Sequence, residues 1–242
     1  MRAEAARSAP HEMRLAGRLA LGAALAAALA APFLGVLLLM EGRYEGLEEL
    51  DRRFADALNS WALQHPGVVD LLTFLQAALS PNTFRLLVLL VAVGLWRAGS
   101  RRRPIWGAVT TGLGALLGVV LKRLVHRARP SFPDPVAAAE SYSFPSAHAL
   151  GSFLGTGVLL LVALPVLSGS ARAVAVGVVT ITGINRIALG VRFFSDVLAG
   201  WFAADALPAG TATVFVAWRG ARRPTDGLDP VDSRRLLRGR RS

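Results

Sequence analysis

The chain has 242 residues, of which 53% are hydrophobic, and its mean hydropathy is +0.47. The apolar residues stand in long blocks, a pattern that indicates an integral membrane protein and excludes an ordinary soluble domain. The net charge of +11 is carried by arginines that cluster just outside these blocks, so membrane topology explains them and no nucleic-acid partner is predicted. The sequence has no cysteine, which excludes disulfides and thiolate metal sites.

Six membrane spans are predicted in chain order. The apolar run 19–40 is longer than the core of a cleavable signal peptide, so it is predicted to be an uncleaved first span. Residues 67–98 are interrupted by Pro81 and are predicted to form a short helix followed by a kinked second span. The other four spans are predicted at residues 105–121, 147–167, 173–189 and 197–218. The expected fold is therefore all-α, an integral membrane bundle of six helices.

The positive charges between the spans predict the orientation. Arginines gather in the N-terminal segment, in the loop with "RRR" at 101–103, at Arg172 and after residue 218, and six spans place all of them on one side. The positive-inside rule makes that side cytoplasmic. The net acidic loop 41–60 then lies outside, together with the segments 122–146 and 185–196.

The predicted organisation has three parts. Residues 1–18 form a cytoplasmic N-terminal segment, residues 19–218 form the six-span membrane domain with a site at its outer face, and residues 219–242 form a basic cytoplasmic tail. The expected location is a bacterial cytoplasmic membrane, with both termini in the cytoplasm.

Three polar motifs fall at the outer ends of these spans. The first is "KRLVHRARP" at 122–130, and on a helix Lys122, His126 and Arg129 would share one face because they stand at i, i+4 and i+7. A basic stripe at a span end is also typical of cations that extend toward the membrane interface, so this motif alone leaves both interpretations open.

The second motif is "FPSAHALG" at 144–151. A serine at the start of a helix stands beside free backbone N–H groups, so Ser146 predicts an anion site that His148, in the first turn, would face.

The third motif, "RIALGVRFFSDVLAGW" at 186–201, places Arg186, Arg192 and Asp196 around the turn between the fifth and sixth spans. Several cations, a helix N-terminus and a histidine together specify a phosphate better than a carboxylate or a sugar. Charged groups are costly at a membrane, so a cluster of them indicates function.

These stretches, read as "K-x6-RP" at 122–130, "PSAH" at 145–148 and "R-x5-R-x3-D" at 186–196, resemble the three signature motifs of the type 2 phosphatidic acid phosphatase and vanadium haloperoxidase superfamily. The resemblance covers roughly residues 50–218 and points to the membrane-bound lipid phosphate phosphatase branch. It implies a lipid phosphate as the partner in the membrane, and it implies no metal and no cofactor.

The resemblance also assigns roles to residues. The phosphate would be held by Lys122, Arg129, Ser146 and Arg186. His148 would protonate the leaving group, and Asp196 would orient the histidine that attacks phosphorus in the family. In this chain the position of that nucleophile is occupied by Arg192.

Arg192 leaves two functions open. A guanidinium stays protonated and offers no lone pair, so a phosphohistidine cannot form at this position. In the first hypothesis water attacks the phosphate, with Asp196 as its base unless an ion pair to Arg192 holds that carboxylate, or with His126 as a substitute. In the second, Arg192 adds a bidentate donor to an inactive site that binds, senses or moves a lipid phosphate. A haloperoxidase is disfavoured, because its vanadate needs the same missing histidine.

The predicted ligand is a lipid of the polyprenyl pyrophosphate or phosphatidate type. The residues alone distinguish neither between these lipids nor between oligomeric states. Asp205 lies inside the sixth span, where it would join either a polar pathway or a hydrogen bond between helices.

Overall fold

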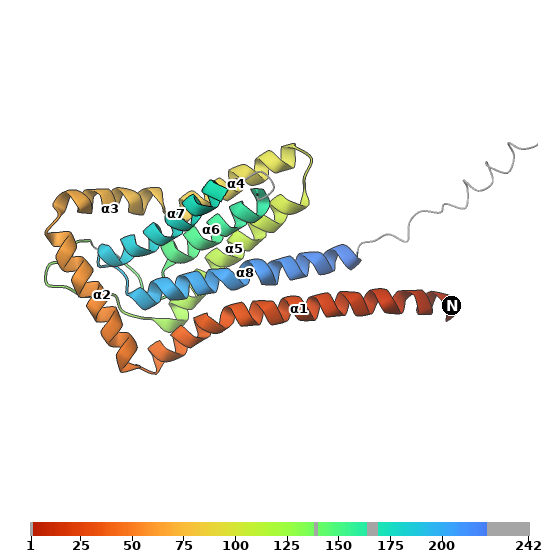
Figure 1. Cartoon of the computed structure of the whole chain (residues 1–242), viewed down its shortest axis with the longest axis horizontal. Coiled ribbons are helices and arrows are strands. Elements are labelled where there is room, and N and C mark those ends of the chain that lie inside the picture. Colours follow the sequence, from red (N-terminus) through yellow and green to blue (C-terminus); the bar gives the residue numbers. More distant parts are fainter. Residues whose placement is uncertain (1, 138–139, 164–168, 222–242) are drawn as a thin grey trace, which may run out of the picture.

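The structure, a computed structural model, describes residues 2–137, 140–163 and 169–221. Within these ranges it consists of eight α-helices joined by turns and loops, without a strand (Figure 1). The helices are α1 (Arg2–Glu41), α2 (Glu45–Leu63), α3 (Pro66–Ala78), α4 (Pro81–Arg97), α5 (Arg102–Val125), α6 (Ala147–Ala163), α7 (Gly169–Ala188) and α8 (Phe194–Ala221). The predicted all-α fold is confirmed.

A helix is found at each of the six predicted spans. The kinked second span corresponds to α3 and α4, which are bent by 40° at the break between them. Pro81 takes the first helical position of α4, where no N–H is needed, and Ser80 caps this helix by accepting from the backbone N–H of Thr83 (3.3 Å). Among the described residues, α1, α5 and α7 are long and apolar enough to cross a membrane, α3 and α4 qualify as a pair, and α6 is a shorter apolar helix.

The acidic segment 41–60, predicted as an outer loop, contains most of helix α2. Its buried residues recur at helical spacing: Asp51, Ala55, Asn59 and Ala62. Two of these four are polar, so this face does not show as an apolar stripe in the sequence.

Helix α6 lies at the centre of the bundle and packs against α4, α5, α7 and α8. Its buried stripe of Leu150, Leu154 and Val158 recurs every four residues and joins the main hydrophobic core. Large apolar side chains stay exposed on the outer faces of the helices, for example Leu90 (59%) and Leu116 (58%), as expected where lipid surrounds a bundle.

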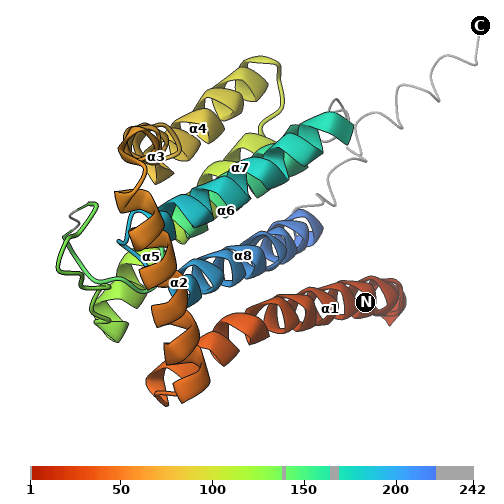
Figure 2. The ribbon, with the colours of Figure 1, turned by 60° about the vertical axis from the view of Figure 1, so that its left-hand side comes forward.

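Helices α1 and α8 pack side by side and run in opposite directions, so the N-terminal end of α1 and the C-terminal end of α8 lie at the same end of the molecule (Figures 1 and 2). Helix α1 continues through residue 18 without a break, so residues 2–18 and the first span are one helix. Of the predicted tail, residues 222–242 lie outside the described residues.

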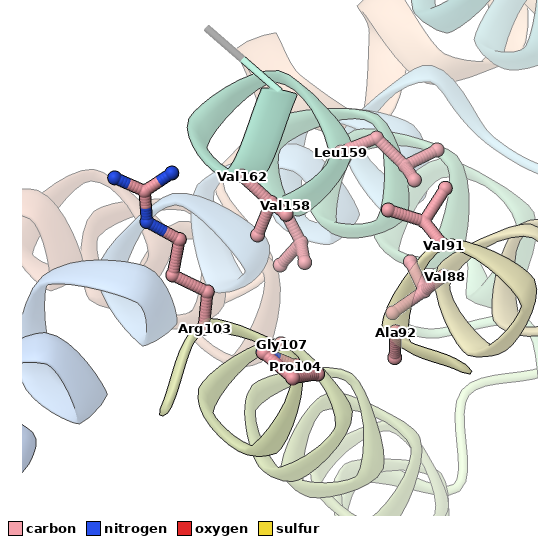
Figure 3. A pocket seen from close by; sticks show the side chains of 9 residues that line it. All are labelled: Val88, Val91, Ala92, Arg103, Pro104, Gly107, Val158, Leu159 and Val162. Carbon is pink, nitrogen blue, oxygen red and sulfur yellow. The ribbon is translucent and has the colours of Figure 1, made fainter. Parts of the chain in front are cut away.

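A small cavity of about 10 Å³ lies between α4, α5 and α6, near the start of α5 (Figure 3). Its lining is almost entirely apolar, and the guanidinium of Arg103 points away from the other lining side chains. At 1.5 Å per residue, Gly107 in its wall is about 22 Å along the helix from Lys122. The cavity therefore belongs to the packing between helices and lies far from the polar motifs.

Candidate functional site

The three motifs meet at one end of the bundle. Lys122 is in the last turn of α5, His148 in the first turn of α6 and Arg186 in the last turn of α7. Arg192 lies in the turn between α7 and α8, just before Asp196 in the first turn of α8. The charges of Lys122, Arg186 and Arg192 all act on His148, so cations of the first and third motifs lie near the histidine of the second.

The first motif departs from its predicted helical geometry. Helix α5 ends at Val125, because His126 adopts a left-handed conformation (φ +50°) and its N–H donates to the carbonyl of Lys122. Arg129 therefore lies beyond the helix, and the prediction that Lys122, His126 and Arg129 share one helical face is wrong. The His126 ring contacts the edge of Tyr142 instead, with 4.5 Å between ring centroids.

Arg129 ties the loop before α6 to the turn before α8. Its Nε donates to the carbonyl of Ser141 and its Nη1 to the carbonyl of Val191, both at 2.7 Å. Burial lowers the pKa of Arg129, and the nearby carboxylate of Asp196 opposes that change. Lys122 reaches the same loop, because its Nζ donates to the hydroxyl of Ser141 (3.4 Å).

Arg192 is buried, with 3% of its surface exposed. Its Nη1 donates to the carbonyls of Tyr142 (3.0 Å) and Ser143, whereas its buried Nε has no partner among the described residues. Burial and the neighbouring charge of Arg129 lower the pKa of Arg192 to about 9, with Asp196 acting in the opposite direction. The side chain therefore stays charged at neutral pH.

Ser146 joins the second motif to the third. Its N–H donates to the carbonyl of Asp196 (2.9 Å), and its hydroxyl accepts from the N–H of Ala149 (3.3 Å), as in an N-cap. Helix α8 comes this close because residue 200 is glycine: a Cβ there would stand 2.7 Å from the carbonyl oxygen of Ser146. The hydroxyl assigned to phosphate binding therefore also caps α6.

Asp196 is fully buried, and both of its carboxylate oxygens are engaged. Oδ1 accepts from Arg127 Nη1 (2.7 Å), and Oδ2 accepts from the N–H of Phe193 (2.9 Å). The ion pair of Asp196 is thus formed with Arg127, and the alternative in which Arg192 is the partner is wrong.

Arg127 and Asp51 are functional-site residues that the sequence reasoning missed. Arg127 Nη2 donates to Asp51 Oδ2 of helix α2 (2.7 Å), and the N–H of Ser195 donates to Asp51 Oδ1 (2.8 Å). Burial by itself would lower the pKa of Arg127, but Asp196 and Asp51 raise it above the usual arginine value. The only sequence signal was the helical spacing of Asp51 with Ala55.

Helix α3 also contributes to the site, which the sequence did not indicate. The side-chain oxygen of Gln76 accepts from Arg186 Nη1, and the Gln76 carbonyl accepts from His148 Nε2 (3.3 Å). Arg186 is buried, and its Nε has no partner in the described part of the chain.

The charge balance of this region favours an anionic ligand. The cations Arg129, Arg186 and Arg192 act on Lys122, while the buried carboxylate of Asp196 is already paired with Arg127. Such a cluster has unneutralised positive charge and free donors, which is what a phosphate requires. No group of three or more His, Cys, Asp or Glu side chains within the described ranges is arranged to hold a metal ion.

Comparisons with known proteins agree with this arrangement. The chain is 38% identical over 96 residues to phosphatidylglycerophosphatase B of Bacillus subtilis (37% of this chain, 47% of that protein). It is 39% identical over 120 residues to decaprenylphosphoryl-5-phosphoribose phosphatase of Mycolicibacterium smegmatis (47% of this chain, 61% of that protein). The matches thus span about half to three-fifths of these relatives.

Two solved structures share the fold. The crystal structure of a transmembrane PAP2-type phosphatidylglycerolphosphate phosphatase from Bacillus subtilis matches with a TM-score of 0.64 and 22% identity, covering 81% of this chain and 98% of that one. Aquifex aeolicus LpxE matches with a TM-score of 0.52 and 21% identity, covering 68% of this chain and 94% of that one. The model of the PAP2 superfamily matches residues 104–222, a segment that contains all three motifs. The chain belongs to the PAP2 superfamily.

Proposed function

We propose that this protein binds the terminal phosphate or pyrophosphate of a membrane lipid at the outer end of its helix bundle, and that it does so without forming a phosphoenzyme. The observation that carries the proposal is the buried, charged guanidinium of Arg192, which stands where the motif resemblance expects the family's nucleophile. A guanidinium binds phosphate oxygens well, but it cannot attack phosphorus because it has no free lone pair.

The neighbours of Arg192 support phosphate binding. Its Nη1 is held by two backbone carbonyls, which leaves the unpartnered Nε to donate to a ligand. Arg186 likewise has an unpartnered, buried Nε, and Lys122 lies within the same field of charge. A bound phosphate would neutralise this cluster and satisfy the free donors.

The relatives support the ligand class. They are named as phosphatases of a phosphatidylglycerophosphate and of a decaprenylphosphoryl phosphoribose, both of which are lipids that carry phosphate. We therefore expect a lipid of the phosphatidate or polyprenyl pyrophosphate type, bound by one membrane-embedded chain whose site faces outward.

Slow hydrolysis by water is the second candidate, and the position of His148 favours it, because this histidine lies among the phosphate-binding cations. Asp196 is poorly placed to act as the base, since Arg127 and the N–H of Phe193 occupy its two oxygens. In a well-studied catalytic triad, loss of the nucleophile costs about six orders of magnitude in rate. Any turnover here would therefore rest on electrostatic stabilisation by the cations and on His148 as the acid.

The test uses full-length protein in maltoside micelles. Lysophosphatidate binding is measured by titration, and phosphate release is measured from lysophosphatidate, phosphatidate and polyprenyl pyrophosphate. We expect saturable binding without release, and release should appear in Arg192→His if the rest of the site is intact. Release by the wild type that disappears in His148→Ala would establish the second candidate instead.

A further inference from the structure

The C-terminal half of α3 lies against the cationic cluster and accepts hydrogen bonds from it through three oxygen atoms. The Gln76 side-chain oxygen accepts from Arg186, and the Gln76 carbonyl accepts from His148. One turn earlier, the carbonyl of Leu72 accepts from the side-chain amide of Asn185 (2.8 Å). All three donors belong to the second and third motifs or stand next to them in the chain.

The end of a helix is suited to this contact. The last carbonyls of a helix lack partners within it and carry the negative end of the helix dipole. Helix α3 ends at Ala78, so the carbonyl of Gln76 belongs to this group. These oxygens therefore meet Arg186 and His148 much as the oxygens of a bound phosphate would.

Helix α3 is also the least anchored element around the site. None of its thirteen residues, all of which the structure describes, is buried, and Phe74 is 67% exposed. It is joined to α4 by the 40° break, whereas Ser146, Arg186 and Arg192 are buried in the bundle. An element with few buried contacts moves at a lower cost in free energy than the packed core.

Resting on the function proposed above, we propose that Gln76 is an internal competitor for Arg186 and His148, which a terminal phosphate must displace in order to bind. A terminal phosphate has three unesterified oxygens and a charge of about −1.5 to −2 at pH 7. A phosphodiester has one charge and two free oxygens, so it gains less at Arg186 when it replaces the neutral amide. The competitor therefore lowers the affinity of every ligand that needs Arg186, and a terminal phosphate overcomes it more readily than a phosphodiester.

The alternative role of Gln76 is that of a helper, which orients Arg186 through its oxygen and donates its amide N–H to the phosphate. The two roles predict opposite signs. Removing a competitor tightens the binding of the terminal phosphate, which must displace it, whereas removing a helper weakens the binding of the terminal phosphate.

The experiment measures the dissociation constants of lysophosphatidate and lysophosphatidylglycerol for full-length protein in maltoside micelles. In Gln76→Ala we expect lysophosphatidate to bind about tenfold tighter, the scale of one hydrogen bond to a charged group, and lysophosphatidylglycerol to gain no more than this factor. In Gln76→Glu, a charged competitor faces Arg186, and both lipids should bind about tenfold more weakly. Gln64→Ala is the matched control, because Gln64 is exposed at the end of α2.

Two results would overturn the inference. Weaker or unchanged lysophosphatidate binding in Gln76→Ala would make Gln76 a helper or a bystander while the proposed function stands. The absence of binding in the wild type and in every variant would reject both proposals. If Gln76→Ala unfolds, Gln76→Met keeps the length of the side chain without its oxygen and must show the same gain in affinity.

Discussion

Arg127 occupies the centre of the polar network that holds α2 against the N-terminal end of α8. It bonds two carboxylates that are almost completely buried, Asp51 and Asp196, and its own side chain is 16% exposed. Two buried carboxylates without a cation between them would repel each other, so this arginine stabilises both. Among the described residues, the ion pair of Asp196 is formed with Arg127 and not with Arg192.

Replacing Arg127 by methionine should destabilise the protein by about 3–5 kcal/mol, because it leaves two buried carboxylates without their cation. The measurement is the free energy of unfolding in mixed micelles. Arg123→Met, at an exposed position of the same helix end, should stay within about 0.5 kcal/mol of the wild type. Equal stabilities of the two variants would contradict the central role of Arg127.

Replacing Arg192 by alanine should weaken lysophosphatidate binding about tenfold or more, the scale of a lost charge-assisted hydrogen bond. Arg192→Lys keeps the charge without the planar group, so it should lose less affinity. Binding is measured by titration, with Arg172→Ala as the control, because Arg172 is exposed near the start of α7. Unchanged affinity in Arg192→Ala would remove this residue from the site.

At the scale of elements, α2 and α3 complete the site, although neither carries one of the three motifs. Helix α2 contributes Asp51, and α3 contributes Gln76. The spans themselves could be predicted because a long apolar run is a local property of the sequence. Neither α2 nor α3 could be assigned to the site in this way, because their contacts are made by single polar side chains rather than by an apolar pattern.

The docking of α2 can be tested by overpacking its buried face. Ala55→Leu should destabilise the protein by about 1–3 kcal/mol, since Ala55 is 2% exposed and its neighbours leave no room for a larger side chain. Ala57→Leu, at an exposed position of the same helix, is the matched control. Both are compared by their unfolding midpoints, and similar midpoints would show that α2 is not held against the bundle.

At the scale of the whole molecule, the helix ends that carry the motifs lie at one end of the bundle, and the terminal ends of α1 and α8 lie together (Figure 2). The distribution of arginines predicts that the end with the motifs faces outward. The absence of cysteine from the sequence makes this orientation testable, because a cysteine introduced at one position is then the only thiol that a maleimide can label.

Ser131→Cys, in the loop after α5, should react with a membrane-impermeant maleimide in intact cells. Ser100→Cys, between α4 and α5, should react only after the membrane is permeabilised. The reverse pattern of labelling would invert the proposed topology and place the site on the cytoplasmic side.

The sequence by itself determined the helical segments and the three short motifs, including the arginine at position 192. These follow from local properties, namely the length of apolar runs and the spacing within short motifs. The tertiary structure decided the partners: Arg127 for Asp196, 69 residues apart, and Gln76 for Arg186, 110 residues apart. In the tertiary structure, α5 also ends before Arg129. Such pairings depend on which helix ends the packed bundle brings together. They cannot be predicted from the periodicity of a single segment.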